Sequence, residues 1–238
     1  MLSVVCYLWR RAAPGGYTPA HVDRLARMVA RRYRRPHRFV VVTNDPGPFA
    51  DGIEVVPDAC DFAALRSPEG LSMPACYRRL RLFHPDAGAI FGPRIVALDL
   101  DVVLTGDVAP LWDRPEPVVL YRDPLFSAQA NGSMLLLRTG TRPHVWATFD
   151  PERSPALAYA AGYRGSDQAW ISYALPDAPR WDTRDGIYSF RRHVAAGAPA
   201  PSTRAVIFHG NPKPWDAGPQ RLAWVREHWG STSTESAR

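Results

Sequence analysis

The sequence predicts an α/β fold: a single domain with a mostly parallel central sheet flanked by helices. Two observations predict it. Residues 2–45 show a strand–helix–strand pattern, and units of this kind build parallel sheets. Later apolar runs lack alternating polar residues, as strands buried on both faces require. With 238 residues, 46% of them hydrophobic, the chain can form one sizeable core.

The N-terminal unit is the best defined part of the pattern. Residues 2–9 (LSVVCYLW) are apolar and rich in valine and aromatics, which is typical of a buried strand. A helix is expected from Pro19, because Thr18 can cap it and proline suits the first helical position. Apolar residues then recur at helical spacing until Pro36 stops the helix. A second buried strand follows over residues 38–45.

The remaining elements follow from apolar runs bounded by turn residues. Further strands are expected at residues 53–58, 94–104, 117–123, 132–140 and 204–210, and helices at 73–85, after Pro74, and 167–175. No internal repeat or linker interrupts the pattern. We therefore expect one domain over residues 1–230 and a frayed, flexible tail over 231–238, which is small and polar.

Two carboxylates interrupt the apolar run at 94–104. An ionised carboxylate in an apolar setting is costly unless a cation or a hydrogen-bond network pairs with it. In a continuous strand Asp99 and Asp101 would point to the same side, with Leu100 facing the core. Two carboxylates on one side suit a hard divalent ion such as Mn²⁺ or Mg²⁺. Capping a turn or pairing with arginines is the alternative.

Three other segments carry polar groups that could act in chemistry. In FHGNPKPW (208–215), His209 could complete a metal shell, Gly210 permits close backbone approach and Lys213 could hold a phosphate. A surface loop is the alternative there. Asp167 and Gln168 stand at a helix start, where N-capping is the simpler interpretation.

Polar residues at the carboxyl end of a strand are candidates for a different reason. Ligands bind beyond the carboxyl ends of parallel strands, and Thr43 and Asn44 lie at such an end. ANGSM (130–134) could be a plain turn.

Charge and cysteine usage limit the classes of partner. The net charge is +6, and much of it lies in residues 24–38, which we interpret as a solvated helix face; attraction to a phosphate-bearing substrate or an anionic surface is the alternative. No aromatic residues alternate with these arginines, so nucleic acid is not expected. The tryptophans Trp215, Trp224 and Trp229 are expected to pack.

The expected location follows from the same composition. Three widely spaced cysteines fit a reducing compartment. No apolar run is long enough to span a bilayer. We expect a cytoplasmic protein, with peripheral attachment to a membrane as an open alternative.

The order of these segments resembles the metal-dependent sugar-nucleotide glycosyltransferases with a GT-A (Rossmann-like) fold, the glycogenin and bacterial galactosyltransferase type of glycosyltransferase family 8. The resemblance covers most of the chain. The D-x-D motif of that family matches Asp99 and Asp101, and its tyrosine–basic–leucine helix matches Arg79. Its other motifs match Asn131, Gly132 and Ser133, the pair Asp167 and Gln168, and the Gly–x–x–Lys–Pro–Trp segment from Gly210 to Trp215.

The resemblance implies an activity and a set of roles. It implies a retaining hexosyltransferase (EC 2.4.1 type) that uses a nucleoside-diphosphate sugar, most often a UDP-sugar, with Mn²⁺ or Mg²⁺ held by the two aspartates and a histidine. Asp167 and Gln168 would lie near the sugar and the acceptor hydroxyl. The remaining candidates, Thr43, Asn44, Arg79, Asn131, Ser133, Gly210 and Lys213, would bind the donor. The acceptor could be a carbohydrate, a lipid-linked sugar or a protein.

The sequence departs from the family at the third metal ligand. The family histidine lies three residues before the glycine, where this chain has Ile207, and His209 comes two residues later. Two residues along a strand return to the same face, so His209 is the expected substitute.

Two alternative functions stay open from sequence. DLDVV also fits the nucleophile motif of haloacid-dehalogenase-type phosphatases, with Asp99 attacking phosphorus. A sugar-nucleotide-binding relative without turnover is the other, and the displaced histidine favours it.

Overall fold

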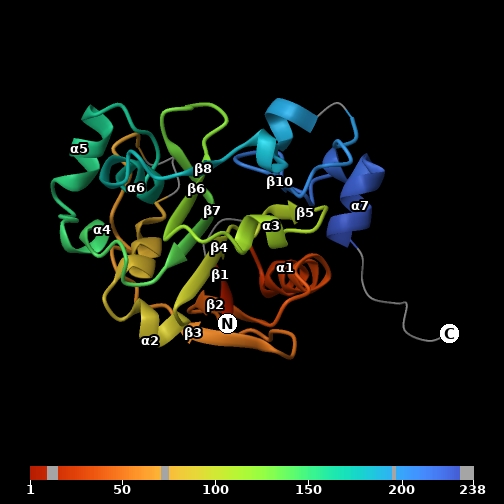
Figure 1. Cartoon of the computed structure of the whole chain (residues 1–238), viewed down its shortest axis with the longest axis horizontal. Coiled ribbons are helices and arrows are strands. Elements are labelled where there is room, and N and C mark those ends of the chain that lie inside the picture. The colour runs from red at the N-terminus through yellow and green to blue at the C-terminus, as the bar shows by residue number, and fades with distance from the viewer. Residues whose placement is uncertain (10–15, 71–74, 195–196, 231–238) are drawn as a thin grey trace.

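A seven-stranded sheet forms the centre of the structure, a computed structural model that describes residues 1–9, 16–70, 75–194 and 197–230 (Figure 1). In spatial order its strands are β3 (Ile53–Pro57), β2 (His37–Thr43), β1 (Leu2–Leu8), β4 (Arg94–Leu98), β7 (Ala130–Arg138), β6 (Val118–Arg122) and β8 (Arg180–Trp181). Neighbouring strands are parallel except where β7 pairs antiparallel with β4 and β6. The predicted α/β fold with a mostly parallel sheet is confirmed.

The N-terminal unit forms as its sequence predicts. Helix α1 (Pro19–Arg32) connects β1 to β2, and the two strands pair in parallel from Leu2 opposite His37 to Leu8 opposite Thr43. The helix ends earlier than Pro36, because Tyr33 already has an extended backbone, with φ −129°. Its buried residues are spaced at helical intervals: Val22, Leu25, Met28 and Val29.

The prediction of one continuous strand over residues 94–104 is wrong. The run divides into β4 and β5 (Val102–Leu104), which belong to different sheets. The three residues between them form a turn, in which the Val102 N–H donates to the Asp99 carbonyl at 3.3 Å. Both halves are buried, so their apolar sequences carry no sign of the change of sheet. Leu100 is buried in the core as expected.

The second sheet has three strands, of which one neighbouring pair is antiparallel and the other parallel. β10 (Ala205–Ile207) pairs antiparallel with β5 and parallel with β9 (Ile187–Ser189). The strand predicted at 204–210 therefore ends at Ile207. Gly210, three residues further on, has a left-handed backbone with φ +67°, so it cannot belong to the strand.

The helix predicted at 73–85 is also shorter and of a different type. Residues 73 and 74 lie outside the described part of the chain, and a 3₁₀ segment η1 (Tyr77–Phe83) follows. The predicted tail 231–238 lies outside the described residues as well.

Helices cover both faces of the central sheet (Figure 1). Alternate residues of β1 enter different cores: Val4, Cys6 and Leu8 pack with α1 and α7 (Ala223–Gly230), and Val5 and Tyr7 pack with η1 and α6 (Asp167–Ala174). The other helical segments are α2 (Ala87–Phe91), α3 (Ala109–Trp112), α4 (His144–Ala147), α5 (Ser154–Ala160), η2 (Thr183–Asp185), the π-helix η3 (Phe190–Val194) and η4 (Pro219–Arg221). No described helix has the length and apolar character needed to cross a bilayer.

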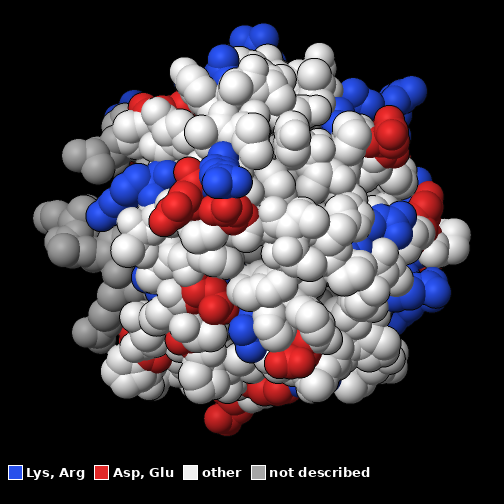
Figure 2. All heavy atoms as spheres, turned by 90° about the vertical axis from the view of Figure 1, so that its left-hand side faces the viewer, with Lys and Arg blue, Asp and Glu red and all other residues white. Residues whose placement is uncertain are grey.

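The C-terminal tryptophans pack as expected. Trp224 and Trp229 are buried in the core beside α1, and Trp215 packs against them. The basic face of α1 is partly used in this contact, because Arg31 donates to the His228 carbonyl at 2.9 Å. On the opposite side of the molecule, over α4–α6, charges of both signs are scattered among broad uncharged stretches (Figure 2).

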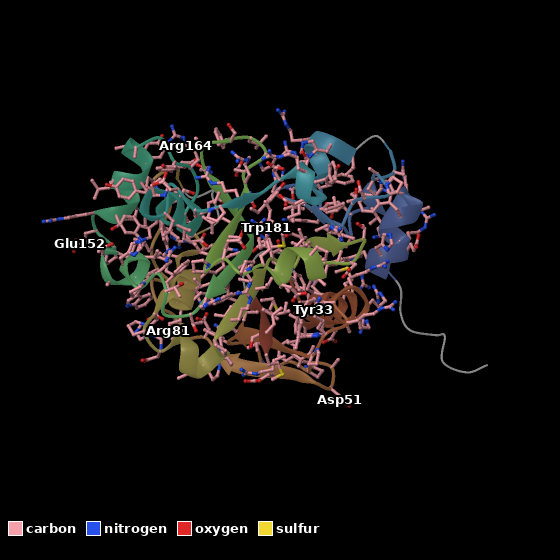
Figure 3. The ribbon with its side chains drawn as sticks, in the orientation of Figure 1. Tyr33, Asp51, Arg81, Glu152, Arg164 and Trp181 are labelled. Carbon is pink, nitrogen blue, oxygen red and sulfur yellow. The ribbon has the colours of Figure 1, made fainter. Side chains whose placement is uncertain are left out.

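Trp181 joins the two sheets. It lies near the middle of the molecule, whereas Asp51 and Glu152 lie at the periphery (Figure 3). Its side chain is 0% exposed and shares one core with β5, β9 and β10.

We expect Trp181→Ala to lower the free energy of unfolding by about 3–5 kcal/mol, because the cavity would lie between the sheets. The half-exposed Leu157 is the control, and Leu157→Ala should cost no more than about 0.5 kcal/mol. Urea denaturation followed by tryptophan fluorescence measures both. Equal losses for the two variants would contradict the central place of Trp181.

Candidate functional site at the edge of the central sheet

Six segments far apart in sequence meet at one edge of the central sheet. Asp99 follows the carboxyl end of β4. Because β7 is antiparallel, its first residues lie at the same edge, and the Asp99 N–H donates to the Ser133 carbonyl at 3.0 Å. The start of α6, the segment η1, the residues before α1 and the loop after β10 contribute the other side chains.

Arg79 is the centre of one half of the site. Its Nη1 donates to Asp99 Oδ1 at 2.5 Å and to the Gly132 carbonyl at 2.9 Å. Its Nε and Nη2 donate to the two Asp167 oxygens at 2.7 and 3.1 Å. Burial opposes the charge, but Asp167 and Asp99 outweigh it and hold the pKa of Arg79 above its ordinary value. The guanidinium therefore fixes two predicted site acids in one arrangement.

Gly132 is required by this arrangement. A Cβ at this position would lie 2.3 Å from Arg79 Nη2, so only glycine leaves room for the guanidinium. The Gly132 N–H in turn donates to Gln168 Oε1 at 3.1 Å, and Gln168 Nε2 donates to the Arg164 carbonyl at 3.2 Å. Gln168 is thereby held at the start of α6 beside Asp167.

Asp101 is the centre of the other half. Its Oδ2 accepts hydrogen bonds from Tyr17 Oη at 2.8 Å and from Lys213 Nζ, and Lys213 Nζ also donates to Tyr17 Oη at 3.1 Å. Its Oδ1 is buried and has no hydrogen-bond partner. Burial raises the pKa of Asp101, Lys213 opposes this, and Asp99 adds to it. One oxygen of this carboxylate is thus satisfied and the other is left without a partner.

Each of the two predicted metal-binding aspartates contacts a cationic side chain in this structure. Asp99 pairs with Arg79, and Asp101 pairs with Lys213. Strand alternation does not place this pair, because the strand ends at Leu98, but the two carboxylates are close enough for Asp99 to raise the pKa of Asp101. The contact of Asp99 with Arg79 is the alternative drawn from the sequence, and a shared metal ion stays a prediction.

The described contact of the His209 ring is with Ser189. Its Nε2 and Ser189 Oγ are 2.7 Å apart, and the pKa of the ring is lowered, chiefly by burial. Ile207, at the family histidine position, is 0% exposed in the core. Within the described ranges, no three His, Cys, Asp or Glu side chains gather closely enough to hold a metal ion.

Asn131 and Ser133 lie at the same edge, next to a residue that the sequence did not suggest. Asn131 Nδ2 donates to Asp123 Oδ2 at 3.2 Å, and Asn131 Oδ1 accepts from the Ser133 N–H at 3.0 Å. Asp123 is buried and also contributes to the electrostatic environment of His209. Asp123 therefore binds the start of β7 and lies near enough to His209 to favour its protonated form.

Thr43 and Asn44 lie at the carboxyl end of β2 as predicted. Thr43 is buried, and its Oγ1 accepts from the Asp45 N–H at 2.8 Å, whereas Asn44 is exposed. No described contact joins either of them to Arg79, Asp101 or Lys213, and β1 lies between their strand and β4.

Sequence reasoning missed Tyr17, Asp123 and Ser189. Tyr17 follows the carboxyl end of β1, so the rule that predicted Thr43 could have found it. Asp123 follows the end of β6 in the same way. Ser189 had no such signal, because its role depends on how β9 pairs with β10.

No protein-family model and no curated protein sequence matches the chain. Solved structures match it in fold. One is the galactosyltransferase LgtC in complex with donor and acceptor sugar analogues, at TM-score 0.63 and 15% identity, covering 98% of this chain and 97% of that one. The chain has a glycosyltransferase fold.

Two further solved structures share this fold. The glycosyltransferase GlyE of Streptococcus pneumoniae TIGR4 matches at TM-score 0.56 and 13% identity over 90% of this chain. The bifunctional glycosyltransferase WbbM matches at TM-score 0.56 and 13% identity over 90% of this chain. The match spans 56% of the GlyE chain and 47% of the WbbM chain.

We expect Gly132→Ala to lower the free energy of unfolding by about 1–3 kcal/mol, since the added methyl overlaps the Arg79 guanidinium. Gly197→Ala is the matched control, because a Cβ at Gly197 meets nothing within 4 Å. Urea titration of both variants measures the difference. A Gly132→Ala protein as stable as the control would show that Arg79 is not confined as described.

Proposed function

We propose that the chain transfers a hexose from a nucleoside-diphosphate sugar, with UDP as the nucleotide, to an acceptor hydroxyl. The observation that carries the proposal is the pair of acid–cation contacts at one sheet edge, Arg79 with Asp99 and Lys213 with Asp101. These contacts lie where α/β sheets bind ligands, on a fold shared with glycosyltransferases.

The leaving group explains why cations are needed there. Transfer breaks the bond between the sugar C1 and a phosphate oxygen, and the electron pair stays on the diphosphate. Lys213 Nζ, already held between Tyr17 and Asp101, is a point charge that could stabilise the developing charge. Arg79 and Asp167, fixed to each other, would orient the sugar, with Gln168 beside them.

The residues at this edge fit a divalent ion that takes only part of its shell from the protein. Mg²⁺ is commonly bound by one or two carboxylates together with substrate phosphates and water. Asp101 offers a buried oxygen without a partner, and the Asp99 side chain is 34% exposed. Asp99 and Asp101 would hold Mn²⁺ or Mg²⁺, which would supply Lewis-acid stabilisation of the leaving diphosphate. The same proposal includes retention of configuration at the sugar C1. It also includes a contact of Thr43 and Asn44 with the base of the nucleotide.

Glycosyl transfer is preferred to phosphoryl transfer through Asp99. A nucleophilic carboxylate attacks phosphorus with the electron density of its oxygens. The Arg79 guanidinium, 2.5 Å from Asp99 Oδ1, draws on that density and makes Asp99 a poorer nucleophile. A fold shared with glycosyltransferases favours the same choice.

We expect Asp101→Asn to lower donor turnover by about 10²-fold or more, because the amide would hold both Lys213 and the divalent ion less well, and these are the cations proposed to stabilise the developing charge. Thermal shift against UDP- and GDP-sugars first selects the donor, and release of the nucleoside diphosphate then measures turnover. Asp51→Asn, at an exposed surface position, should retain wild-type turnover. Turnover of Asp101→Asn within a few-fold of wild type would overturn the assigned role.

We also expect UDP to bind more tightly with Mn²⁺ than with EDTA in calorimetry, since the ion would join the carboxylates to the phosphates. The affinity for UMP, which has a single phosphate, should increase less when Mn²⁺ replaces EDTA. Equal UDP affinity under both conditions would remove the ion from the proposal while leaving sugar transfer in place.

A further inference from the structure

An arginine lies directly against the glycine of the loop after β10. Arg191 Nη1 is 3.2 Å from the point that a Cβ on Gly210 would occupy. Gly210 also has φ +67°, which favours glycine for a second reason. A side chain at position 210 would therefore meet both backbone strain and the guanidinium. The close approach brings Arg191 to the loop that carries Lys213.

The backbone beneath Arg191 is well anchored. Arg191 belongs to the short π-helix η3, and π-type turns are frequent at functional sites. Phe190 stacks on Phe208 with ring centroids 4.2 Å apart, which ties the start of η3 to the residues just before Gly210. The Ser189 N–H donates to His193 Nδ1 at 2.9 Å, closing the turn. The backbone is therefore fixed on both sides of Arg191, whose side chain is exposed.

Arg191 and Lys213 both act on His209. Burial lowers the pKa of His209 most; Asp123 opposes this, and Arg191, Lys213 and His193 lower it further. Both cations are therefore near enough to this half-buried ring to disfavour its protonation. Lys213 already has an acidic partner in Asp101, whereas Arg191 forms no ion pair with any acidic side chain in the described part of the chain. An exposed cation on an anchored backbone, without an acidic partner, is available to an incoming anion.

We propose that Arg191 is a second binding residue for the donor diphosphate and contacts the phosphate next to the sugar, beside Lys213. The inference rests on the proposed function and names a further residue of that same site. An arginine can hold a phosphate through two parallel N–H donors, which a lysine cannot do. The contact strengthens as the C1–O bond breaks, because the electron pair moves onto the oxygen of that phosphate. The new C–O bond forms to the acceptor hydroxyl, which releases its proton to solvent.

Calorimetry with UDP and UMP tests the assignment, because only UDP carries the second phosphate. We expect Arg191→Gln to weaken UDP binding by about tenfold or more, the range of a charge-assisted hydrogen bond, and UMP binding by less than about twofold. Arg191→Lys should fall between wild type and Arg191→Gln for UDP, because the charge stays and the fork is lost. Arg192→Gln is the matched control, an exposed arginine one residue away on the same segment, and should bind both ligands as wild type does.

Three outcomes separate the inference from the function on which it rests. If the wild-type protein binds none of UDP, GDP or ADP, the proposed function fails first. Wild-type UDP affinity in Arg191→Gln, when the wild type does bind UDP, would overturn the role of Arg191 alone. An equal loss in Arg191→Gln and Arg192→Gln would also overturn it, since the effect would then belong to the general positive field. Melting temperatures of all variants confirm that each is folded.

Discussion

The buried guanidinium of Arg79 is the interaction on which the site depends. It joins the turn after β4, the start of β7 and the start of α6, which are distant in sequence. A buried ion pair is weak evidence of net stability, but removing one partner leaves an uncompensated charge at a cost of about 3–5 kcal/mol. Glycine at position 132, the bend between the two sheets and the first residues of α6 all accommodate this side chain. The geometry of the edge follows from that requirement.

The second acidic residue of the site, Asp101, has fewer of its hydrogen bonds formed. Asp101 is almost fully buried, with one oxygen bound by Tyr17 and Lys213 and the other without a partner. Desolvation without full hydrogen bonding raises the free energy of the folded state. Groups kept in this condition are concentrated where ligands bind, because the ligand supplies the missing contact. Arg79 therefore gives the edge its rigidity, and Asp101 with Lys213 gives it the capacity to bind.

Much of the fold and part of the candidate site could be predicted from the sequence, and the errors have physical causes. The βαβ unit followed from apolar periodicity and from Thr18 and Pro19, which are local signals. The division at Asp99 to Asp101 left no such signal, because β4 and β5 are equally buried in separate sheets. The expectation that His209 replaces the family histidine stays a prediction, but strand alternation no longer supports it, because β10 ends at Ile207. Tyr17 donates to Asp101 across a sequence separation of 84 residues, and no local pattern encodes such a contact.

A crystal structure of the protein with UDP and Mn²⁺ would test the central claim most directly. Our account predicts the diphosphate at the edge between Asp101, Lys213 and Gly210, with Arg79 still bound to Asp99 and Asp167. UDP bound elsewhere on the molecule, with the contact between Lys213 and Asp101 intact, would contradict it.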